Sequence, residues 1–176
     1  VQALQSITSR NVDPIESAVV SVTQIHAGDT WNVIPDAAVL RGTTRAFRPE
    51  VRDLLERRVR EVCSGVAATY GAQAKVRYER RYPPTVNAVR ETEICASVLE
   101  GMIGMENVIR VPPVMGSEDF AFMLQAKAGC YVFIGNGPGA GGCMLHNPHY
   151  DFNDEVLPLG AGYWASLVEH ILAAPA

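Results

Sequence analysis

The feature that most constrains the fold is an apolar repeat in the first half of the chain. Hydrophobic residues recur there at spacings of three and four, at Val51, Leu54, Leu55, Val59, Val62 and Val66. This spacing predicts an amphipathic helix, with Pro49 where a first helical turn tolerates proline and Gly71 suited to end it. Two charged pairs at i,i+4 should support the helix, Asp53 with Arg57 and Glu56 with Arg60.

Strand patterns surround this helix. The stretch Val19 to Ile25 is rich in β-branched residues, and Ala37 to Phe47 alternates in side-chain character, so both are expected to be strands. In the first, Val20, Val22 and Ile25 should share one face. A third strand is expected around Lys75 to Tyr82, and the opening residues predict a helix in front. Together these elements predict a two-layer α+β unit, with an antiparallel sheet and helices on one face.

The chain beyond Pro84 has a different composition. A helix is expected from Glu91 to Met102, and an apolar run at Cys130 to Ile134 without alternation predicts a strand covered on both faces. A closing helix should present Tyr163 to Ile171. These are too few strands for a complete parallel sheet, so the missing strands are expected upstream of Val1. The overall prediction is an α/β fold.

Charge and composition exclude several classes of function. The chain has 19 acidic and 15 basic residues and a formal net charge of -4, without the clustered Lys and Arg that a nucleic-acid surface needs. No apolar run reaches the roughly 18 residues of a membrane span, and no signal-peptide pattern opens the chain. We therefore expect no nucleic acid or membrane partner and a cytoplasmic protein. The four scattered cysteines are expected to be free, buried thiols.

His146 is the first candidate for chemistry. It follows the expected buried strand and a glycine-rich turn, where α/β proteins place ligands, and a neutral imidazole suits Zn²⁺ or Mn²⁺. Asp151 or Asp154 could orient its second ring nitrogen. A loop histidine is also commonly only a hydrogen-bonded surface residue. The turn itself makes a poor phosphate cradle, because Pro138 removes a backbone donor and no phosphate-binding motif is present.

Two further candidates are polar. In Gly116-Ser-Glu-Asp-Phe120, two adjacent carboxylates follow a serine that could instead cap a short helix running through Met123. In the hairpin region, the Asn32 amide and the Arg45 guanidinium could together hold a carboxylate or polarise a carbonyl. From spacing alone, a turn residue and a cross-strand surface charge explain the second pair better.

Three ordered motifs decide between these alternatives. They are Asn32-Val-Ile-Pro-Asp36 with Gly42-Thr-Thr-Arg45, Met115-Gly-Ser-Glu-Asp-Phe120, and Met144-Leu-His-Asn-Pro148 with Tyr150-Asp-Phe-Asn-Asp154. In this combination the chain resembles the zinc-type metallopeptidase family of aminoacylases and carboxypeptidases. Within that family it is most similar to the branch of hippurate hydrolases and indoleacetyl-amino-acid hydrolases. The likeness covers nearly the whole chain.

The resemblance implies a role for each part. Residues 1–82 would be a lid that also forms a homodimer, and residues 83–176 the C-terminal part of a catalytic domain with two divalent metals (Zn, Mn, Co or Ni). His146 matches the last metal ligand of the family. Asn32 and Arg45 match lid residues that reach the substrate, Asn32 across the dimer in the neighbouring subunit's site. Glu118 matches a supporting residue near the site.

The resemblance also implies that much of the site is absent. The family's Cys-and-His metal motif, its paired glutamates with the general base and a further histidine segment belong ahead of position 1, so no catalytic residue is assigned here. One imidazole cannot hold a metal pair, because catalytic zinc takes about three protein ligands. The expected function is metal-assisted hydrolysis of N-acyl amino acids such as hippurate by the full-length protein, with this chain inactive alone. The alternative is a non-catalytic dimerisation or binding module.

Overall fold

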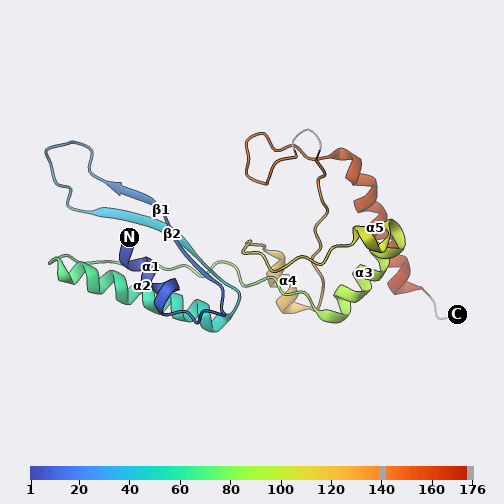
Figure 1. The fold of residues 1–176 in the computed structure, drawn as a ribbon, viewed down its shortest axis with the longest axis horizontal. Coiled ribbons are helices and arrows are strands. Elements are labelled where there is room, and N and C mark those ends of the chain that lie inside the picture. The colour runs from blue at the N-terminus through green and yellow to red at the C-terminus, as the bar shows by residue number, and fades with distance from the viewer. Residues whose placement is uncertain (139–141, 174–176) are drawn as a thin grey trace. The chain divides into compact units, whose positions relative to one another are not determined.

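The computed structural model describes residues 1–138 and 142–173 (Figure 1). The chain divides into two compact units. The first holds Val1–Pro84 together with Val114–Glu118, and the second holds Thr85–Pro113 and the chain from Asp119 onward. No helix in the described ranges has the length and apolar character to cross a bilayer. The assignment of a lid to residues 1–82 and of a catalytic part to residues 83–176 stays a prediction.

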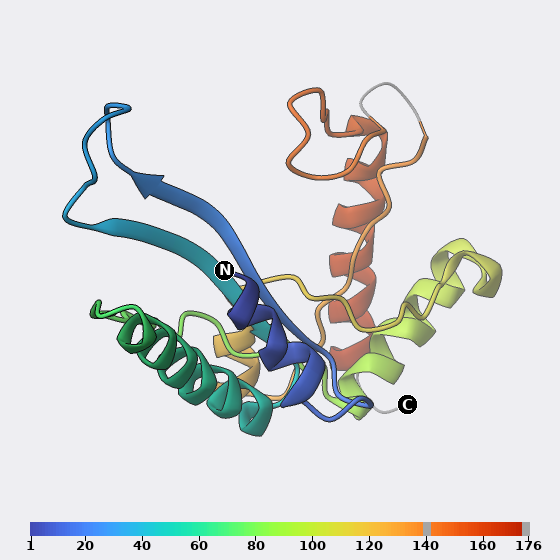
Figure 2. The same cartoon turned by 60° about the vertical axis from the view of Figure 1, so that its left-hand side comes forward.

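The first unit has the element order expected for its first 70 residues. Helix α1 (Gln2–Arg10) precedes strands β1 (Ala18–Ala27) and β2 (Ala38–Ala46), which form an antiparallel pair, and helix α2 (Pro49–Thr69) follows. Both helices lie beside the hairpin (Figure 2). The predicted antiparallel sheet with helices on one face is therefore confirmed, with two strands.

A β-bulge sets the faces of the hairpin. Val22 pairs with Gly42 and Gln24 with Arg41, so Thr23 is an extra residue in β1. Because directly opposed residues share a face, the bulge leaves Val20, Val22 and Ile25 on one side, as predicted. A Cβ on Gly42 would overlap the carbonyl oxygen of Ser21. Only glycine therefore fits this point of β2 without movement of the backbone.

The core of the first unit lies between the hairpin and the two helices. Its buried members are Ile7, Val12, Val20, Val51 and Leu55, and Ala18 and Ala46 pack against them. Since Ala18, Val20 and Ala46 belong to one face of the hairpin, the helices cover that face. The apolar repeat that predicted α2 thus supplies Val51 and Leu55 to this core.

Helix α2 begins and ends as its sequence indicates. Pro49 occupies the first turn after the extended residue Arg48. At the other end Gly71 has a φ of 68°, and the amides of Gly71 and Ala72 donate to the carbonyl oxygens of Ala68 and Ala67 at 3.1 and 2.9 Å. This is the Schellman arrangement, in which a left-handed glycine satisfies the last carbonyls of a helix.

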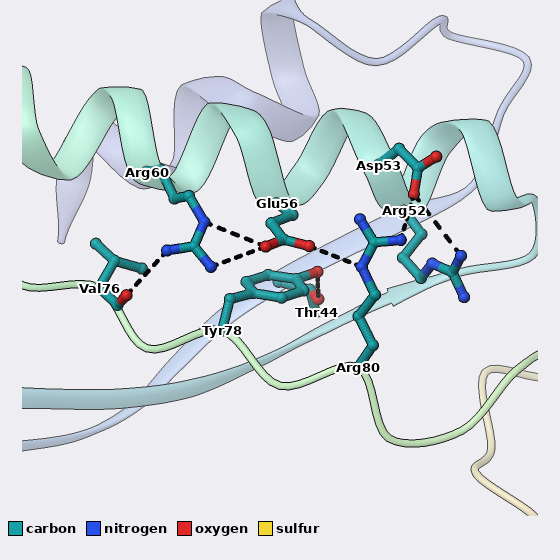
Figure 3. Close-up of polar contacts among 8 residues, drawn as sticks. All are labelled: Thr44, Arg52, Asp53, Glu56, Arg60, Val76, Tyr78 and Arg80. Atoms are coloured by element: carbon teal, nitrogen blue, oxygen red, sulfur yellow. Dashed lines mark hydrogen bonds and ion pairs between the residues drawn. The ribbon is translucent and has the colours of Figure 1, made fainter.

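The strand predicted at Lys75 to Tyr82 is wrong. No strand is assigned between β2 and α3 in this fully described stretch. Side chains hold the segment instead: Arg60 donates to the Val76 carbonyl oxygen at 2.9 Å, and the hydroxyls of Tyr78 and Thr44 lie 2.5 Å apart (Figure 3). Alternation predicted the extended backbone, but a strand also requires ladder bonds to a neighbour.

Glu56 is the centre of the charged contacts that fix this segment on α2 (Figure 3). Its carboxylate accepts hydrogen bonds from Arg60 at 2.8 Å and from Arg80 at 2.7 Å. These two hydrogen bonds, Arg60 first, lower the pKa of Glu56. The predicted Glu56–Arg60 pair is confirmed. The predicted partner of Asp53 is wrong, because Asp53 pairs with Arg80 at 2.7 Å.

The second unit is mainly helical in its described residues. It contains α3 (Val89–Ile103), the 3-10 turn η1 (Met105–Asn107), α4 (Phe120–Ala126), the 3-10 turn η2 (Asp154–Val156) and α5 (Leu157–Leu172). Cys95 and Val98 of α3 pack with Tyr163 of α5 in a small buried cluster. The helices predicted around Glu91 to Met102 and Tyr163 to Ile171 are confirmed.

The strand predicted at Cys130 to Ile134 is wrong. The segment has no strand assignment, and Phe133 and Ile134 are 67% and 46% exposed. Its first residues are held by Asn87, just before α3, whose side-chain amide exchanges two hydrogen bonds with the backbone of Tyr131 at 2.8 and 2.9 Å. The apolar run is suited to a covered strand, but the described part of this unit offers no strand to pair with it.

Candidate functional site

Asn32 lies in the loop that joins β1 to β2. Thr30 donates from its hydroxyl to Asn32 Oδ1 at 3.4 Å, which leaves the Nδ2 amine as the group that can donate to a ligand. The neighbouring side chains are apolar and exposed: Trp31 fully, Ile34 at 94% and Val33 at 60%. The loop therefore presents one amide among uncovered hydrophobic side chains.

Arg45 lies at the opposite end of the hairpin from Asn32. It pairs with Val19, and seven positions of β2 separate it from the last pair, Ala27 with Ala38. At about 3.3 Å per residue this is about 23 Å of strand. Within one chain the two side chains do not come together, so the expectation that they jointly hold one carboxylate is wrong for a single copy. Their separate roles stay predictions.

The structure does bring Arg45 to the segment that carries Glu118. Arg45 Nη1 donates to the Met115 carbonyl oxygen and, at 3.3 Å, to Ser117 Oγ. Ser117 is not a helix cap, because α4 begins at Phe120 and Asp119 holds the cap position. The prediction of a serine cap is therefore wrong, and the Ser117 hydroxyl instead accepts a hydrogen bond from Arg45 on β2. Glu118 is half-buried at the end of the same segment.

His146 lies in the second unit with a left-handed backbone, at a φ of 70°. It is the third residue of a turn in which the Asn147 amide donates to the Met144 carbonyl oxygen at 3.2 Å. Such a φ in a residue with a Cβ costs about 1 to 3 kcal/mol and clusters at functional sites. Its imidazole is exposed. Within residues 142–173 neither Asp151 nor Asp154 hydrogen-bonds to this ring, contrary to the role suggested for one of them.

Two asparagines close the base of the loop that carries His146. Asn136 Oδ1 accepts from the Asn153 amide at 2.7 Å, and Asn136 Nδ2 donates to the Asp151 carbonyl oxygen at 2.8 Å. Asn153 Nδ2 in turn donates to the Asn136 carbonyl oxygen at 3.3 Å, and Asn153 Oδ1 accepts from the Glu155 amide at 3.1 Å. The sequence analysis missed this pair. The one available signal was an Asn immediately before the acidic turn at Asp154, which is typical of a cap.

The cysteines of the described chain are free. Burial raises the pKa of the Cys63 thiol, and it raises the pKa of Cys130, which lies beside Thr92 and Cys95. Burial also raises the pKa of the neighbouring Tyr163 hydroxyl. A raised thiol pKa lowers the thiolate fraction, so Cys63 and Cys130 are not suited to act as nucleophiles.

A metal centre does not fit the residues that the structure describes. Across residues 1–138 and 142–173 no three His, Cys, Asp or Glu side chains gather closely enough to hold an ion. His146 supplies one imidazole, whereas a catalytic zinc takes about three protein ligands. The described residues therefore offer a candidate ligand without a metal site.

The comparisons with known proteins agree with the motifs. The sequence profile of peptidase family M20/M25/M40 matches residues 7–170. The chain belongs to this family. The resemblance to metallopeptidases and aminoacylases drawn from the three motifs is thereby confirmed.

Three relatives illustrate the membership in M20. Hippurate hydrolase of Campylobacter jejuni is 37% identical over 168 residues, which are 95% of this chain and 43% of that protein. IAA-amino acid hydrolase ILR1-like 4 of Arabidopsis thaliana is 35% identical over 178 residues, 98% of this chain and 40% of that protein. The crystal structure of Bacillus subtilis YXEP, described as a dinuclear metal binding peptidase from the M20 family, matches with a TM-score of 0.74 and 30% identity, covering 99% of this chain and 46% of that one.

The matches cover nearly all of this chain but less than half of each relative, so they support its fold more directly than its function. The M20 match confirms the predicted α/β fold class. The chain spans less than half the length of the relatives it matches. The activity of a whole protein is therefore a matter for proposal.

Proposed function

We propose that the full-length protein of this M20 chain is an amidohydrolase that cleaves the amide bond of N-acyl amino acids of the hippurate type. The family match over residues 7–170 carries the proposal, and two relatives are named for hydrolysis of hippurate and of IAA-amino acids. The chain keeps Asn32, Arg45, Glu118 and His146 at the motif positions. This combination supports a hydrolase more strongly than a dimerisation module without activity.

Divalent metals belong to this proposal. A structural relative is described as a dinuclear metal binding peptidase, and we propose two ions per complete site, from Zn, Mn, Co or Ni, with His146 as one ligand. Among the described residues no group of three or more His, Cys, Asp or Glu side chains could hold an ion. The 176-residue chain is accordingly proposed to be inactive alone, with the general base and the remaining ligands supplied by other parts of the full-length protein.

Asn32 is the substrate-facing donor in this proposal. Its Nδ2 amine can donate to the oxygen on which charge develops during attack on the amide, or to the free carboxylate of the amino acid. Replacement of one such donor typically costs about 100- to 1,000-fold in turnover. Asn32→Ala should therefore cut kcat/KM in the active protein by about this factor, with unchanged circular dichroism. Kinetics equal to wild type would remove Asn32 from the site.

A cytoplasmic homodimer completes the proposal. The β1–β2 loop exposes Trp31, Val33 and Ile34, and uncovered apolar side chains gathered in one loop mark association surfaces. Free cysteines are typical of a reducing compartment. Light scattering should show a dimer that a Trp31→Ser, Ile34→Ser variant weakens, whereas Val89→Ser, at another exposed apolar site in the second unit, leaves it intact. A dimer that withstands the double substitution would place the interface elsewhere.

The deciding experiment measures divalent-metal content together with release of glycine from hippurate. It compares the 176-residue chain with the longer polypeptide that includes the remaining M20 motifs. Turnover and about two bound metals in the longer polypeptide alone would agree with the proposal. Turnover by the short chain would show that the site has been assigned to the wrong residues. Dimers of the longer polypeptide without turnover on any N-acyl amino acid would favour the non-catalytic binding module.

A further inference from the structure

Arg45 projects from the face of the hairpin that the helices do not cover. Ala18, Val20 and Ala46 share the opposite face and pack into the core with α1 and α2. Arg45 pairs with Val19 and therefore points away from that core. On this helix-free face its Nη1 donates to the Met115 carbonyl oxygen and to Ser117 Oγ.

The segment that Arg45 holds has an unusual position in the chain. Val114–Glu118 groups with the hairpin unit, although Pro113 before it and Asp119 after it belong to the second unit. The segment contains no helix or strand. A Cβ built on Gly116 would meet nothing within 4 Å, so packing does not fix its centre. The contacts from Arg45 fall on the residues directly before and after this glycine.

We propose that Arg45 is a positioning residue, which fixes Met115, Gly116 and Ser117 on β2 and thereby sets the place of Glu118, instead of binding the substrate carboxylate. The importance of Glu118 in this inference rests on the proposed function, whereas the contacts of Arg45 with Met115 and Ser117 do not depend on it. One nitrogen of the guanidinium serves two oxygens that lie two residues apart. Charge-assisted bonds of this kind are stronger than neutral ones, and the planar fork of Arg gives them a fixed direction that Lys lacks.

The first test needs no activity. Cleavage after Glu118 by a glutamate-specific protease, followed by mass spectrometry, is compared in the wild type, Arg45→Met, Arg45→Lys and Ser117→Ala. Because hydrogen bonds to charged groups are individually strong, Arg45→Met should free the segment and speed this cleavage by about tenfold or more. Arg45→Lys should restore part of the resistance, and Ser117→Ala, which removes one of the two acceptors, should give a smaller increase.

Arg41 provides the matched control. It lies on the same strand and the same face as Arg45, opposite Gln24. Arg41→Met should leave cleavage after Glu118 unchanged. Equal cleavage rates in wild type and Arg45→Met would overturn the proposal, and so would an equal effect of Arg41→Met, because loss of any positive charge on β2 would then explain the result.

The second test separates positioning from carboxylate binding in the active full-length protein. Benzoate release is measured from hippurate and from its uncharged amide. A positioning role predicts that Arg45→Lys lowers kcat for both substrates by the same factor and leaves their ratio of KM values unchanged. A selective rise in KM for hippurate would show that Arg45 binds the carboxylate and would overturn the proposal. If the wild type released no benzoate from either compound, the proposed function would fail, while the cleavage experiment would still decide the role of Arg45.

Discussion

Removal of the Asn136 side chain is the sharpest test of the loop that carries His146. Asn136→Ala deletes the acceptor of the Asn153 amide at 2.7 Å and the donor to the Asp151 carbonyl oxygen at 2.8 Å. Each net hydrogen bond contributes about 1 kcal/mol, and an unsatisfied half-buried amide costs about as much again. The base of the loop should therefore lose about 1 to 3 kcal/mol of local stability. Since about 1.4 kcal/mol corresponds to a factor of ten, the Asn153 amide should exchange about 10- to 100-fold faster.

Hydrogen exchange followed by mass spectrometry over residues 150–156 measures this effect. Amides near Cys95 and Tyr163 in the core of the same unit should keep their protection. Asn107→Ala is the matched control, because it removes another asparagine hydrogen bond of the second unit, to the Ile103 carbonyl oxygen at 2.7 Å. Unchanged exchange at Asn153 in Asn136→Ala would refute the reasoning. An increase of the same size in Asn107→Ala would assign it to general loosening of the unit.

Three further predictions concern the first unit. Leu55→Ala should cost about 3 to 5 kcal/mol of unfolding free energy in urea, because Leu55 is fully buried in the core; a loss below about 1 kcal/mol would contradict that packing. Gly42→Ala should cost about 1 to 3 kcal/mol, since its Cβ would overlap Ser21, whereas Gly65→Ala, with open space around it, should not destabilise. The pKa of Glu56 is lowered in the fold, so its stabilising effect is present above the ordinary carboxyl value of 4.5 and is lost as pH falls below it. Glu56→Gln should therefore flatten the acid branch of stability, and an unchanged acid branch would count against the ion pairs.

Local patterns were sufficient to predict the parts of the fold that local chemistry determines. The repeat around Leu55 predicted α2 from Pro49 to its glycine end. The prediction that Val20, Val22 and Ile25 share one face of β1 is also correct, although the sequence did not predict the bulge between Val22 and Gln24. The strands expected at Lys75 to Tyr82 and Cys130 to Ile134 failed for a common reason. A strand needs backbone hydrogen bonds to a neighbouring strand. Sequence periodicity indicates an extended backbone but does not indicate whether such a neighbour is present.

The site was predicted less completely than the fold. Motifs marked Asn32, Arg45, Glu118 and His146 as residues of interest, and their roles remain predictions. Nothing in the spacing showed that Arg45 would contact the chain at Met115, seventy residues later. The Asn136–Asn153 pair was missed because its hydrogen bonds join distant backbone atoms. Such contacts depend on how the loop closes, which neither residue type nor local propensity encodes.

Because Val114–Glu118 belongs to the first unit, the chain cannot be divided into its two units by a single cut. The first unit is a discontinuous domain, completed by five residues inserted from the far side of Pro113. A cut between Pro84 and Thr85 gives one piece without those residues and another that carries them as a loop without its hairpin. The first piece therefore lacks part of its unit, whereas the second contains its whole unit together with the separated segment. An isolated hairpin domain would have to be engineered with residues 114–118 supplied as a grafted or added peptide.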